Sequence, residues 1–482
     1  MRTDREGFLA RLCATSAADP ARLAVAGTAA ALTYGALAGH VAGMAGWLLR
    51  AGLAPGQMAG VTIRDDVAHL VVTLALMRLG CHQVALGSHD PPELRGDLAA
   101  RAGVVVVLGD GPGDALPDLP LLLPDHAAGA DPSLAALVPD GLPEASAQVV
   151  LTSSGTTGRP KLIPLSQRAV FAQSARRRGL GAVRHRPVGL EHNNGMRFAL
   201  HTLANGATCV LAEASRAIGV EAACRRFGIE MLGLSPYQAE ALLARQRQEA
   251  WPARATIDLA GNAPGDGLVR RLHEQLTREV YVLYGTTEVG SVARAGPAEF
   301  DACPEGSGRV MPGAAVASVD VHGAALPAGE HGLIRIRTEG MAERYLGDAE
   351  ATARSFFDGW FHTGDVGRLL PDGTLVVAGR ADDMMILGTL NIFPAEIERV
   401  AAAFPGVGEC AAFAVRHATL GDIPMLAATE VAPGALDVAA LQAQCRARLG
   451  LRAPRRVVVV AALPRNAAGK VLRRELAAQV AG

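Results

Sequence analysis

A segment rich in hydroxyls and glycines, which ends in a lysine, has the residue types needed to bind phosphate groups. Residues 152–161 read Thr-Ser-Ser-Gly-Thr-Thr-Gly-Arg-Pro-Lys, and they follow an apolar run at 148–151 that predicts a strand. Glycines let backbone N–H groups approach phosphate oxygens, hydroxyls donate further hydrogen bonds, and lysine adds positive charge. A solvated Ser/Thr turn would seldom hold these residues in this order. The segment therefore predicts a phosphate-binding loop.

Two common phosphate-binding loops are excluded by the residues present. A Walker A loop requires G-x-x-x-x-G-K-[ST], whereas Gly158 is followed by Arg159, and the pair Gly469-Lys470 is followed by a valine. A dinucleotide-binding turn requires a third glycine, and the glycine-rich segment 109–114 ends in an aspartate instead. We therefore reject a nicotinamide-dependent dehydrogenase.

Four further motifs follow the loop along the chain. They are Tyr-Gly-Thr-Thr-Glu at 284–288, Trp-Phe-His-Thr-Gly-Asp at 360–365, Gly-Arg-Ala-Asp-Asp at 379–383 and Pro-Arg-Asn-Ala-Ala-Gly-Lys-Val-Leu-Arg at 464–473. In this order they resemble the signatures of the adenylate-forming superfamily, which includes acyl-CoA and aryl-CoA synthetases, adenylation domains of nonribosomal peptide synthetases, and luciferases. The resemblance extends from about Leu32 to the end of the sequence.

The resemblance implies an acid–thiol ligase. Such an enzyme joins a carboxylic acid to AMP with release of pyrophosphate, and it passes the acyl group to the thiol of coenzyme A or of a phosphopantetheine on a separate carrier protein. Its cofactors would be ATP and Mg²⁺. Since both reactants are anionic, the site must neutralise charge and hold the reactants in line. Residue types able to do this are present in every one of the motifs.

The residues that the resemblance assigns to the nucleotide lie in the loop, in the motifs at 284–288 and 360–365, and in two flanking segments. They are Thr152, Ser153, Ser154, Gly155, Thr156, Gly158, Lys161, Asn262, Ala263, Pro264, Tyr284, Gly285, Thr286, Thr287, Asp365 and Arg380. Asp365 would accept hydrogen bonds from both ribose hydroxyls, and Thr287 would contact the α-phosphate. Without the other motifs, Asp365 would read as an ordinary turn residue.

Three residues are assigned to catalysis by the resemblance, namely Lys470, Thr157 and Glu288. Lys470 would lie between the substrate carboxylate and the α-phosphate and stabilise the transition state. Glu288 would also bind magnesium, which prefers oxygen ligands and bridges phosphates. In isolation, Lys470 would read as a surface residue and Glu288 as a solvated or capping one.

The acyl pocket is predicted from one segment and two flanking positions, namely His192, Asn193, Gly195, Ser235 and Gly261. A histidine followed by asparagine also occurs in similar enzymes that activate hydroxylated aryl acids, which favours a small polar or aryl acid. A packed histidine with satisfied nitrogens is an equal reading of His192. Thr389 stands near the place where similar enzymes have a glycine beside the thiol tunnel, so thioester formation is less firmly predicted than adenylation.

Alternating apolar helical and strand patterns predict an α/β fold of two domains. We expect an N-terminal AMP-binding domain at 1–380, made of αβ-layered subdomains and a β-barrel-like part. A small mobile α+β domain at 381–482 would carry the lysine loop. Val104 to Val107 is predicted to be a strand buried on both faces. In similar enzymes the small domain rotates about a hinge, here Asp382, between the two half-reactions.

The composition excludes several other classes of protein. The chain has 482 residues, a formal net charge of -1 and 50% hydrophobic residues, so it favours neither nucleic acid nor a membrane as a partner. Seven scattered cysteines without a C-x-x-C pair argue against a disulfide framework or a zinc site. No signal peptide pattern follows the N-terminus. A cytoplasmic enzyme is therefore expected.

Two other functions remain open at this point. One is a non-catalytic protein on the same fold that binds a nucleotide or an acyl-adenylate, and the intact Lys470 and Glu288 argue against it. The other is an adenylating enzyme whose acceptor is not a thiol. The run Arg176-Arg177-Arg178 would contact the 3′-phosphate of coenzyme A, or else form a solvated face, as such runs usually do.

Overall fold

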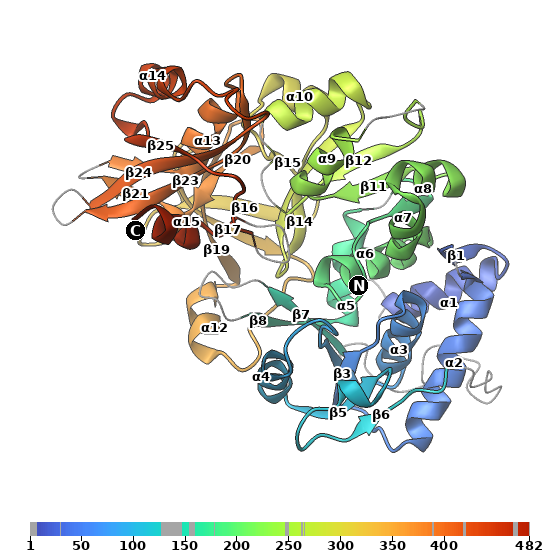
Figure 1. Cartoon of the computed structure of the whole chain (residues 1–482). Helices are drawn as coiled ribbons and strands as arrows, with labels where there is room; N and C mark the ends of the chain where they lie inside the picture. The colour runs from blue at the N-terminus through green and yellow to red at the C-terminus, as the bar shows by residue number, and fades with distance from the viewer. Residues whose placement is uncertain are drawn as a thin grey trace.

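Three β-sheets with covering helices organise the computed structural model (Figure 1). It describes residues 7–28, 30–126, 147–153, 160–177, 179–245, 250–261, 264, 266–387, 390–417, 421–465 and 471–481. Several predicted site residues lie outside these ranges. They are Ser154, Gly155, Thr156, Thr157, Gly158, Asn262, Ala263, Thr389 and Lys470.

A six-stranded sheet carries the start of the predicted phosphate loop. Its order is β6 (Leu121–Leu122), β5 (Val104–Gly109), β3 (Met58–Thr62), β4 (His82–Ala85), β7 (Gln148–Ser153) and β8 (Lys161–Ser166). The neighbouring strands are parallel except for β7 and β8. Helices α3 (Asp66–Arg78) and α4 (Pro92–Ala102) form the crossovers. The expectation that β5 is buried on both faces is wrong at Val105, which is 44% exposed. The register shifts at this point, so that Val104 pairs with Met58, Val106 pairs with Ala59, and Val105 is the extra residue between them.

A second, longer sheet combines parallel and antiparallel strands. Its parallel part consists of β9 (Val183–His185), β10 (Thr208–Val210), β11 (Met231–Leu234), β12 (Thr256–Leu259), β13 (Val280–Thr286) and β1 (Leu23–Ala26), which β2 (Ala31–Thr33) extends. The antiparallel part is β14 (Gly290–Ala295), β15 (Gly308–Val310), β16 (Ala314–Val319), β17 (Gly332–Thr338), β18 (Phe356–Phe357), β19 (Trp360–Leu369) and β20 (Thr374–Arg380). These antiparallel strands correspond to the predicted β-barrel-like part, and they continue the sheet in an open order.

Helices cover both sheets, and several of them begin at side chains that cap them. They are α1 (Phe8–Ala18), α2 (Tyr34–Arg50), α5 (Gln167–Ala175), α6 (Asn193–Ala204), α7 (Ala212–Ile218), α8 (Val220–Phe227), α9 (Pro236–Leu243), α10 (Asp266–Gln275), α11 (Pro297–Ala302) and α12 (Ala349–Ser355). The side chains of Thr33, Asp65 and Ser166 accept hydrogen bonds from the first turns of α2, α3 and α5, as N-caps do.

A third sheet belongs to the end of the chain, which we call the C-terminal unit (residues 381–481); residues 7–380 are the large region. Its strands are β21 (Met385–Leu387), β22 (Leu390–Ile392), β23 (Val407–His417), β24 (Gly421–Glu430) and β25 (Arg456–Val459), and its helices are α13 (Pro394–Ala402), α14 (Val438–Leu449) and α15 (Arg473–Ala481). Two clusters of buried apolar side chains contain residues of this unit alone. It therefore has cores of its own.

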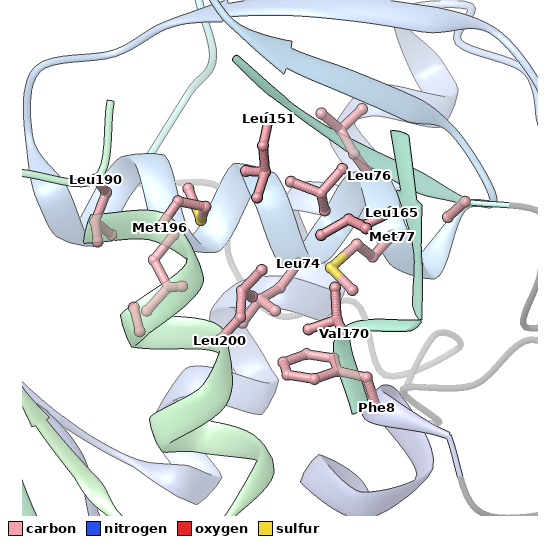
Figure 2. Close-up of a cluster of buried hydrophobic side chains, with 14 of the residues drawn as sticks. Phe8, Leu74, Leu76, Met77, Leu151, Leu165, Val170, Leu190, Met196 and Leu200 are labelled. Carbon is pink, nitrogen blue, oxygen red and sulfur yellow. The ribbon is translucent and has the colours of Figure 1, made fainter. Parts of the chain in front are cut away.

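A shared apolar core joins the six-stranded sheet to the helix behind the predicted acyl pocket. Figure 2 shows Leu151 of β7, Leu76 of α3 and Met196 of α6 in one cluster, together with Leu190 and Leu200. Each of these side chains is at most 4% exposed. Because close-packed interiors tolerate little displacement, the end of β7 and the start of α6 are held in a fixed relation.

Among the residues described, no helix has the length and the apolar character needed to cross a lipid bilayer.

Candidate active site

Asn193 joins the start of the phosphate loop to the predicted acyl pocket. The backbone N–H of Thr152 donates to Asn193 Oδ1 at 2.8 Å, and Asn193 Nδ2 donates to Thr152 Oγ1 at 3.1 Å. Thr152 lies near the end of β7, and Asn193 is the first residue of α6. Ser153 pairs with Lys161 across β7 and β8, so the two described ends of the loop lie side by side.

Gly195 is the one pocket residue whose type is dictated by a close backbone approach. A Cβ at this position would lie 2.1 Å from the carbonyl oxygen of Gly189 and 2.6 Å from that of Val188. Any side chain would therefore push α6 away from the preceding loop. His192 precedes the helix and is exposed, which removes the packed-histidine reading.

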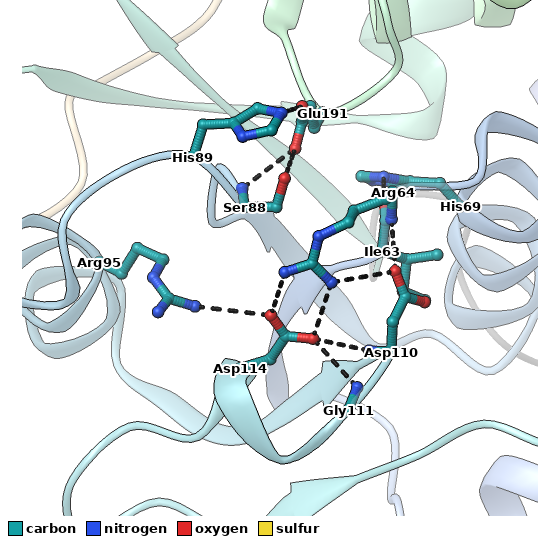
Figure 3. A network of polar contacts seen from close by, with 10 residues as sticks. All are labelled: Ile63, Arg64, His69, Ser88, His89, Arg95, Asp110, Gly111, Asp114 and Glu191. Atoms are coloured by element: carbon teal, nitrogen blue, oxygen red, sulfur yellow. Dashed lines mark hydrogen bonds and ion pairs between the residues drawn. The ribbon is translucent and has the colours of Figure 1, made fainter.

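The loop before α6 is held by a polar network at the carboxyl ends of β3, β4 and β5 (Figure 3). Glu191 accepts hydrogen bonds from the N–H of Ser88 at 3.0 Å and from its Oγ at 2.8 Å. Burial would raise the pKa of Glu191, but these hydrogen bonds outweigh it and lower the pKa. Nearby, Arg64 pairs with Asp114 at 2.8 Å. Asp114, which argued against a dinucleotide turn, thus pairs with Arg64 within this network.

Glu288 lies in a second polar cluster that includes a residue not predicted from the sequence. Tyr345 donates its hydroxyl to Glu288 Oε1 at 2.8 Å, and Lys161 Nζ lies 4.4 Å from the centre of the Tyr345 ring. Tyr345 and Glu288 are 3% and 7% exposed. Burial, followed by the charge of Glu288, raises the pKa of Tyr345. Tyr345 therefore stays protonated and orients the carboxylate.

The donor set around Glu288 fits a magnesium ion held jointly by protein and nucleotide. One carboxylate oxygen of Glu288 accepts from Tyr345, and the other has no hydrogen bond from any described residue. Among described residues, no group of three or more His, Cys, Asp and Glu side chains could hold a metal alone. Magnesium bound to substrate phosphates needs only one or two protein carboxylates. In addition, the buried hydroxyl of Thr286 has no hydrogen-bond partner within the described part of the chain, as expected of a group that binds a ligand.

Asp365 forms the third cluster, with Tyr284 and Arg380. Tyr284 donates its hydroxyl to Asp365 Oδ2, and Arg380 Nη1 lies 3.2 Å from Asp365 Oδ1. Burial raises the pKa of Asp365 despite these two partners. Asp365 and Arg380 face each other in the pairing of β19 with β20, which explains their contact. A carboxylate has about four acceptor positions, so Asp365 keeps capacity for two ribose hydroxyls.

The remaining nucleotide-binding candidates lie at the carboxyl ends of neighbouring strands. Tyr284, Gly285 and Thr286 end β13, Thr287 follows in a half-buried turn, and the half-buried Pro264 follows β12. Gly261, which was predicted for the acyl pocket, also follows β12. A Cβ on Gly285 would lie 2.1 Å from the carbonyl oxygen of Gly290, so the turn needs glycine. Ligands of α/β sheets bind at this edge of the strands.

Ser235 also lies at this edge of the sheet, but its side chain caps the start of α9. Its hydroxyl accepts from the N–H of Gln238 at 3.2 Å, and its own N–H donates to Gln238 Oε1 at 2.9 Å. This reciprocal capping box starts α9. Ser235 therefore borders the pocket through its position, while its hydroxyl is already engaged.

The arginine run that follows α5 does not form the solvated face that was one of its two predicted interpretations. Arg176 donates to the carbonyl oxygens of Val289 and Ser291, and Arg177 pairs with Asp258 at 2.8 Å. Both residues are half-buried, so neither lies on a solvated face. The prediction was wrong because a local run of charges does not reveal the strands that pack against it; Arg178 lies outside the described residues.

The described neighbours of Lys470 contact the large region near the acyl pocket. Arg465 and Val471 form a β-bridge, and the guanidinium of Arg465 lies 5.3 Å from the ring of Tyr237 in α9. Tyr237 follows Ser235 by two residues. Asp382, the predicted hinge, is exposed in a 3₁₀ turn at Ala381–Asp383 and lies 3.4 Å from Arg380.

The fold and the site together are those of an adenylate-forming ligase. The chain belongs to the AMP-binding enzyme family: residues 13–346 match the family model of that description, and residues 396–470 match the model of the AMP-binding enzyme C-terminal domain. The predicted superfamily, fold class and class of enzyme are thereby confirmed.

Relatives with assigned activities resemble the chain along nearly its whole length. A 2-succinylbenzoate–CoA ligase of Geobacillus kaustophilus is 27% identical over 470 residues, which cover 95% of both chains. A fatty acid–[acyl-carrier-protein] ligase of Streptomyces coeruleorubidus is 27% identical, over 95% of this chain and 93% of the other.

Solved structures agree with the fold. The o-succinylbenzoate CoA synthetase of Bacillus subtilis, in complex with its acyl-adenylate, has a TM-score of 0.83 at 22% identity and 97% coverage of both chains. An amide bond synthetase from Marinactinospora thermotolerans has a TM-score of 0.85 at 24% identity, over 98% of this chain and 99% of the other. At these identities the likeness concerns the fold alone.

Proposed function

We propose that this chain activates a small polar or aryl carboxylic acid with ATP, releases pyrophosphate, and transfers the acyl group from the acyl-adenylate to the thiol of coenzyme A. One observation carries the proposal. Segments far apart in the sequence meet through direct contacts: Thr152 with Asn193, Tyr345 with both Lys161 and Glu288, and Tyr284 with Asp365. These contacts join the phosphate loop, the acyl segment and two nucleotide motifs.

The residues of the large region would bind and orient both substrates. Asp365 would accept from the ribose hydroxyls, while Tyr284 and Arg380 keep its carboxylate in position. Lys161 and the loop that begins at Thr152 would bind the triphosphate. A magnesium ion bound by Glu288 would neutralise phosphate charge. Holding two anions in line and compensating their charge is how such a site lowers the barrier.

The C-terminal unit would act as a lid that supplies Lys470 during adenylation. The bridge between Arg465 and Val471, together with the contact of Arg465 with Tyr237, supports this because it brings the ends of the lysine loop to the pocket side of the large region. We propose 1–380 and 381–482 as the two domains, and Asp382 as the hinge between them. Residues near Leu387 would border the path of the thiol after rotation.

The choice of acceptor rests on the relatives. Several similar proteins are named CoA ligases, and another is named a carrier-protein ligase. We propose coenzyme A as the acceptor and a separate holo-carrier as the alternative. We propose a cytoplasmic location, where ATP and coenzyme A are available, and the absence of a disulfide among the described residues agrees with a reducing compartment.

ATP–pyrophosphate exchange tests the reaction and identifies the acid. Fatty, aryl, hydroxyaryl, dicarboxylic and amino acids would be compared at fixed ATP and Mg²⁺, and the best acid would be repeated with coenzyme A and with a holo-carrier. Exchange that depends on one class of acid is expected. Nucleotide binding without exchange for any acid would favour a non-catalytic binding protein instead.

A matched pair of tyrosine variants tests the assignment of Glu288. Tyr345→Phe removes the hydroxyl that orients the carboxylate, so we expect exchange to fall by about fivefold to tenfold and to need more Mg²⁺. Tyr281→Phe removes a hydroxyl that hydrogen-bonds Glu279 on a more exposed part of β13, and it should change neither. Equal effects of the two variants on the Mg²⁺ titration would contradict the role of Glu288.

A further inference from the structure

Two arginines near the acyl pocket lack a carboxylate partner. Arg186 follows β9, and Arg197 lies in α6. Neither forms an ion pair with any residue that the structure describes. The acidic side chain that acts on Arg186 is Asp258, which is already shared by Arg177 at 2.8 Å and Arg294 at 3.6 Å. The acidic side chain that acts on Arg197 is Glu288, which forms no ion pair with it. The charges of Arg186 and Arg197 are therefore not compensated by a direct partner.

The surroundings of both arginines make an unpaired charge costly. Burial, followed by the charge of Arg177, lowers the pKa of Arg186 to about 10, and the same two causes lower the pKa of Arg197 to about 10. Arg186 Nε is buried and has no hydrogen-bond partner. Desolvated cations normally have an anion beside them. Both side chains nevertheless keep some accessible surface, so a ligand can reach them.

Their positions lie between the acyl pocket and the nucleotide motif. A Cβ built on Gly233 would lie 3.1 Å from Arg186 Nη1 and 3.4 Å from Phe198, and Gly233 precedes Ser235 by two residues. Arg197 follows Asn193 by four residues, so both point from the same face of α6. Arg197 Nη1 donates to the carbonyl oxygen of Thr286 at 3.0 Å.

The sheet order separates Gly233, which lies beside Arg186, from the predicted nucleotide motif at the end of β13. β12 lies between β11, which carries Gly233, and β13, which ends at Thr286. Two strand spacings amount to about 10 Å. Arg186 therefore lies on the acyl side of the pocket. Arg197 lies between Arg186 and the nucleotide motif. An anion that contacts both guanidinium groups would therefore lie on the acyl side of Thr286.

We propose that Arg186 and Arg197 form an anion subsite of the acyl pocket, and that the substrate acid carries a second carboxylate which this subsite binds. The proposal rests on the adenylation function proposed above and names the class of acid within it, a dicarboxylic acid. Guanidinium groups suit this task because their planar donors match the two oxygens of a carboxylate. The carboxylate that reacts would lie at the other end, near Thr287.

Matched acids test the proposal. ATP–pyrophosphate exchange would be measured with aryl and aliphatic dicarboxylic acids, each paired with the monomethyl ester that blocks the distal carboxylate. We expect the wild type to prefer the diacid by about tenfold or more in kcat/KM. Arg186→Gln and Arg197→Gln should lower kcat/KM for the diacid by about tenfold to hundredfold and leave the monoester nearly unchanged, because each removes a charge-assisted hydrogen bond.

A control variant and a binding measurement complete the test. Arg184→Gln alters another buried arginine of β9, which donates to Gly181 at the other end of the strand, and it should not change the preference. Arg197→Lys keeps the charge, so it should retain part of the preference. A diacid should also raise the Tm of the wild type and not that of the two Gln variants.

Several outcomes would overturn the subsite. Equal kcat/KM for diacid and monoester in the wild type, or equal loss for both in the variants, would assign the arginines to the reacting carboxylate or to folding. If a diacid did not change the Tm of the wild type, the anion subsite would also be contradicted, and this result would not depend on catalysis. Failure of every acid in exchange, with an Arg-dependent shift in Tm retained, would contradict only the adenylation function.

Discussion

The large region and the C-terminal unit use polar side chains in different ways. In the large region, Glu288 and Asp365 are buried and bonded to tyrosines that come from other segments of the chain. The described contacts between the two parts include the ion pair of Arg399 with Glu305 at 3.2 Å, whose side chains are 38% and 35% exposed. Pairs this exposed contribute about 0–1 kcal/mol.

This difference suggests that the large region binds the substrates and that movement of the C-terminal unit selects the half-reaction. Buried, mutually bonded groups keep a site in its geometry before the substrate arrives, which is the source of electrostatic catalysis. A unit with its own cores and exposed contacts can leave and return without unfolding. Variants of the two parts should therefore affect different half-reactions, and the following predictions start with the largest expected effect.

Lys470→Ala should have the largest effect, and only on adenylation. Removal of a cation that stabilises the transition state is expected to lower acid-dependent ATP–pyrophosphate exchange by about 10²–10³-fold. ATP binding, measured by calorimetry, should persist because the large region holds the nucleotide. Transfer from a supplied acyl-adenylate to coenzyme A should also persist. Arg474→Ala, on the exposed side of α15, is the matched control.

Exchange by Lys470→Ala at the wild-type rate would remove this residue from the reaction. A loss of ATP binding equal to the loss of exchange would place the lysine with the nucleotide, and the contrast between the two parts would then fail.

Asp365→Ala should have the next largest effect, and it should act on binding. The variant removes the proposed acceptor of the ribose hydroxyls and leaves Arg380 with Asp382 as its acidic neighbour. We expect the KM for ATP to rise by about tenfold to hundredfold, as for lost hydrogen bonds to a charged group. A fall in kcat at saturating ATP without any change in KM would contradict the assignment to the ribose.

The nucleotide site illustrates what a sequence can predict. The nucleotide-binding candidates could be found in the sequence because each motif is short and its residues are adjacent. Their roles were predicted from the resemblance to the family. The contact of Asp365 with Arg380 could be derived from a hairpin register. Tyr345 could not, because its partners Lys161 and Glu288 lie far away in the sequence.

The arginines, in contrast, could not be assigned from the sequence. Arg177 reads as part of a solvated run, and Arg197 stands in none of the motifs although it lies two residues beyond Gly195. Whether a charged side chain faces water, a carboxylate or an empty pocket depends on which strands pack against it. That information is absent from local composition. Helical spacing alone, which puts Arg197 on the face of Asn193, is the signal that could have found it.

Asp382→Pro should have a smaller and selective effect, on transfer to the thiol. Proline fixes φ near −65°, which suits the observed 3₁₀ turn but resists the backbone rotation that a hinge requires. We expect adenylation to be nearly unchanged and acyl-CoA formation to fall by more than about tenfold, consistent with a gating step. Asp382→Ala removes the contact with Arg380 without fixing the backbone, so it distinguishes the loss of this contact from the restriction of the backbone by proline. Parallel losses in both half-reactions would argue against a hinge here.

The smallest expected effect concerns the stability of the two parts in acid. His185 and His201 are buried in the large region, and burial lowers the pKa of His185 to about 4 and that of His201 well below its ordinary value. The C-terminal unit has one histidine, the exposed His417. Because the unfolded chain binds protons more readily than the folded one, the stability contributed by the neutral histidines is present above pH 6.5 and lost as the pH falls below it.

At pH 5.5 this loss amounts to about 1.4 kcal/mol for His185 relative to neutral pH. All three tryptophans, Trp47, Trp251 and Trp360, belong to the large region, so their fluorescence during urea unfolding reports on that region alone. Hydrogen exchange of β23 and β24 would report on the C-terminal unit. We expect acid to lower the urea midpoint seen by tryptophan and to leave the protection factors of β23, corrected for the intrinsic exchange rate at each pH, unchanged, and His185→Gln should reduce the pH dependence. A midpoint that is equal at pH 7.5 and 5.5 would show that these histidines accept protons without unfolding the region that binds the nucleotide.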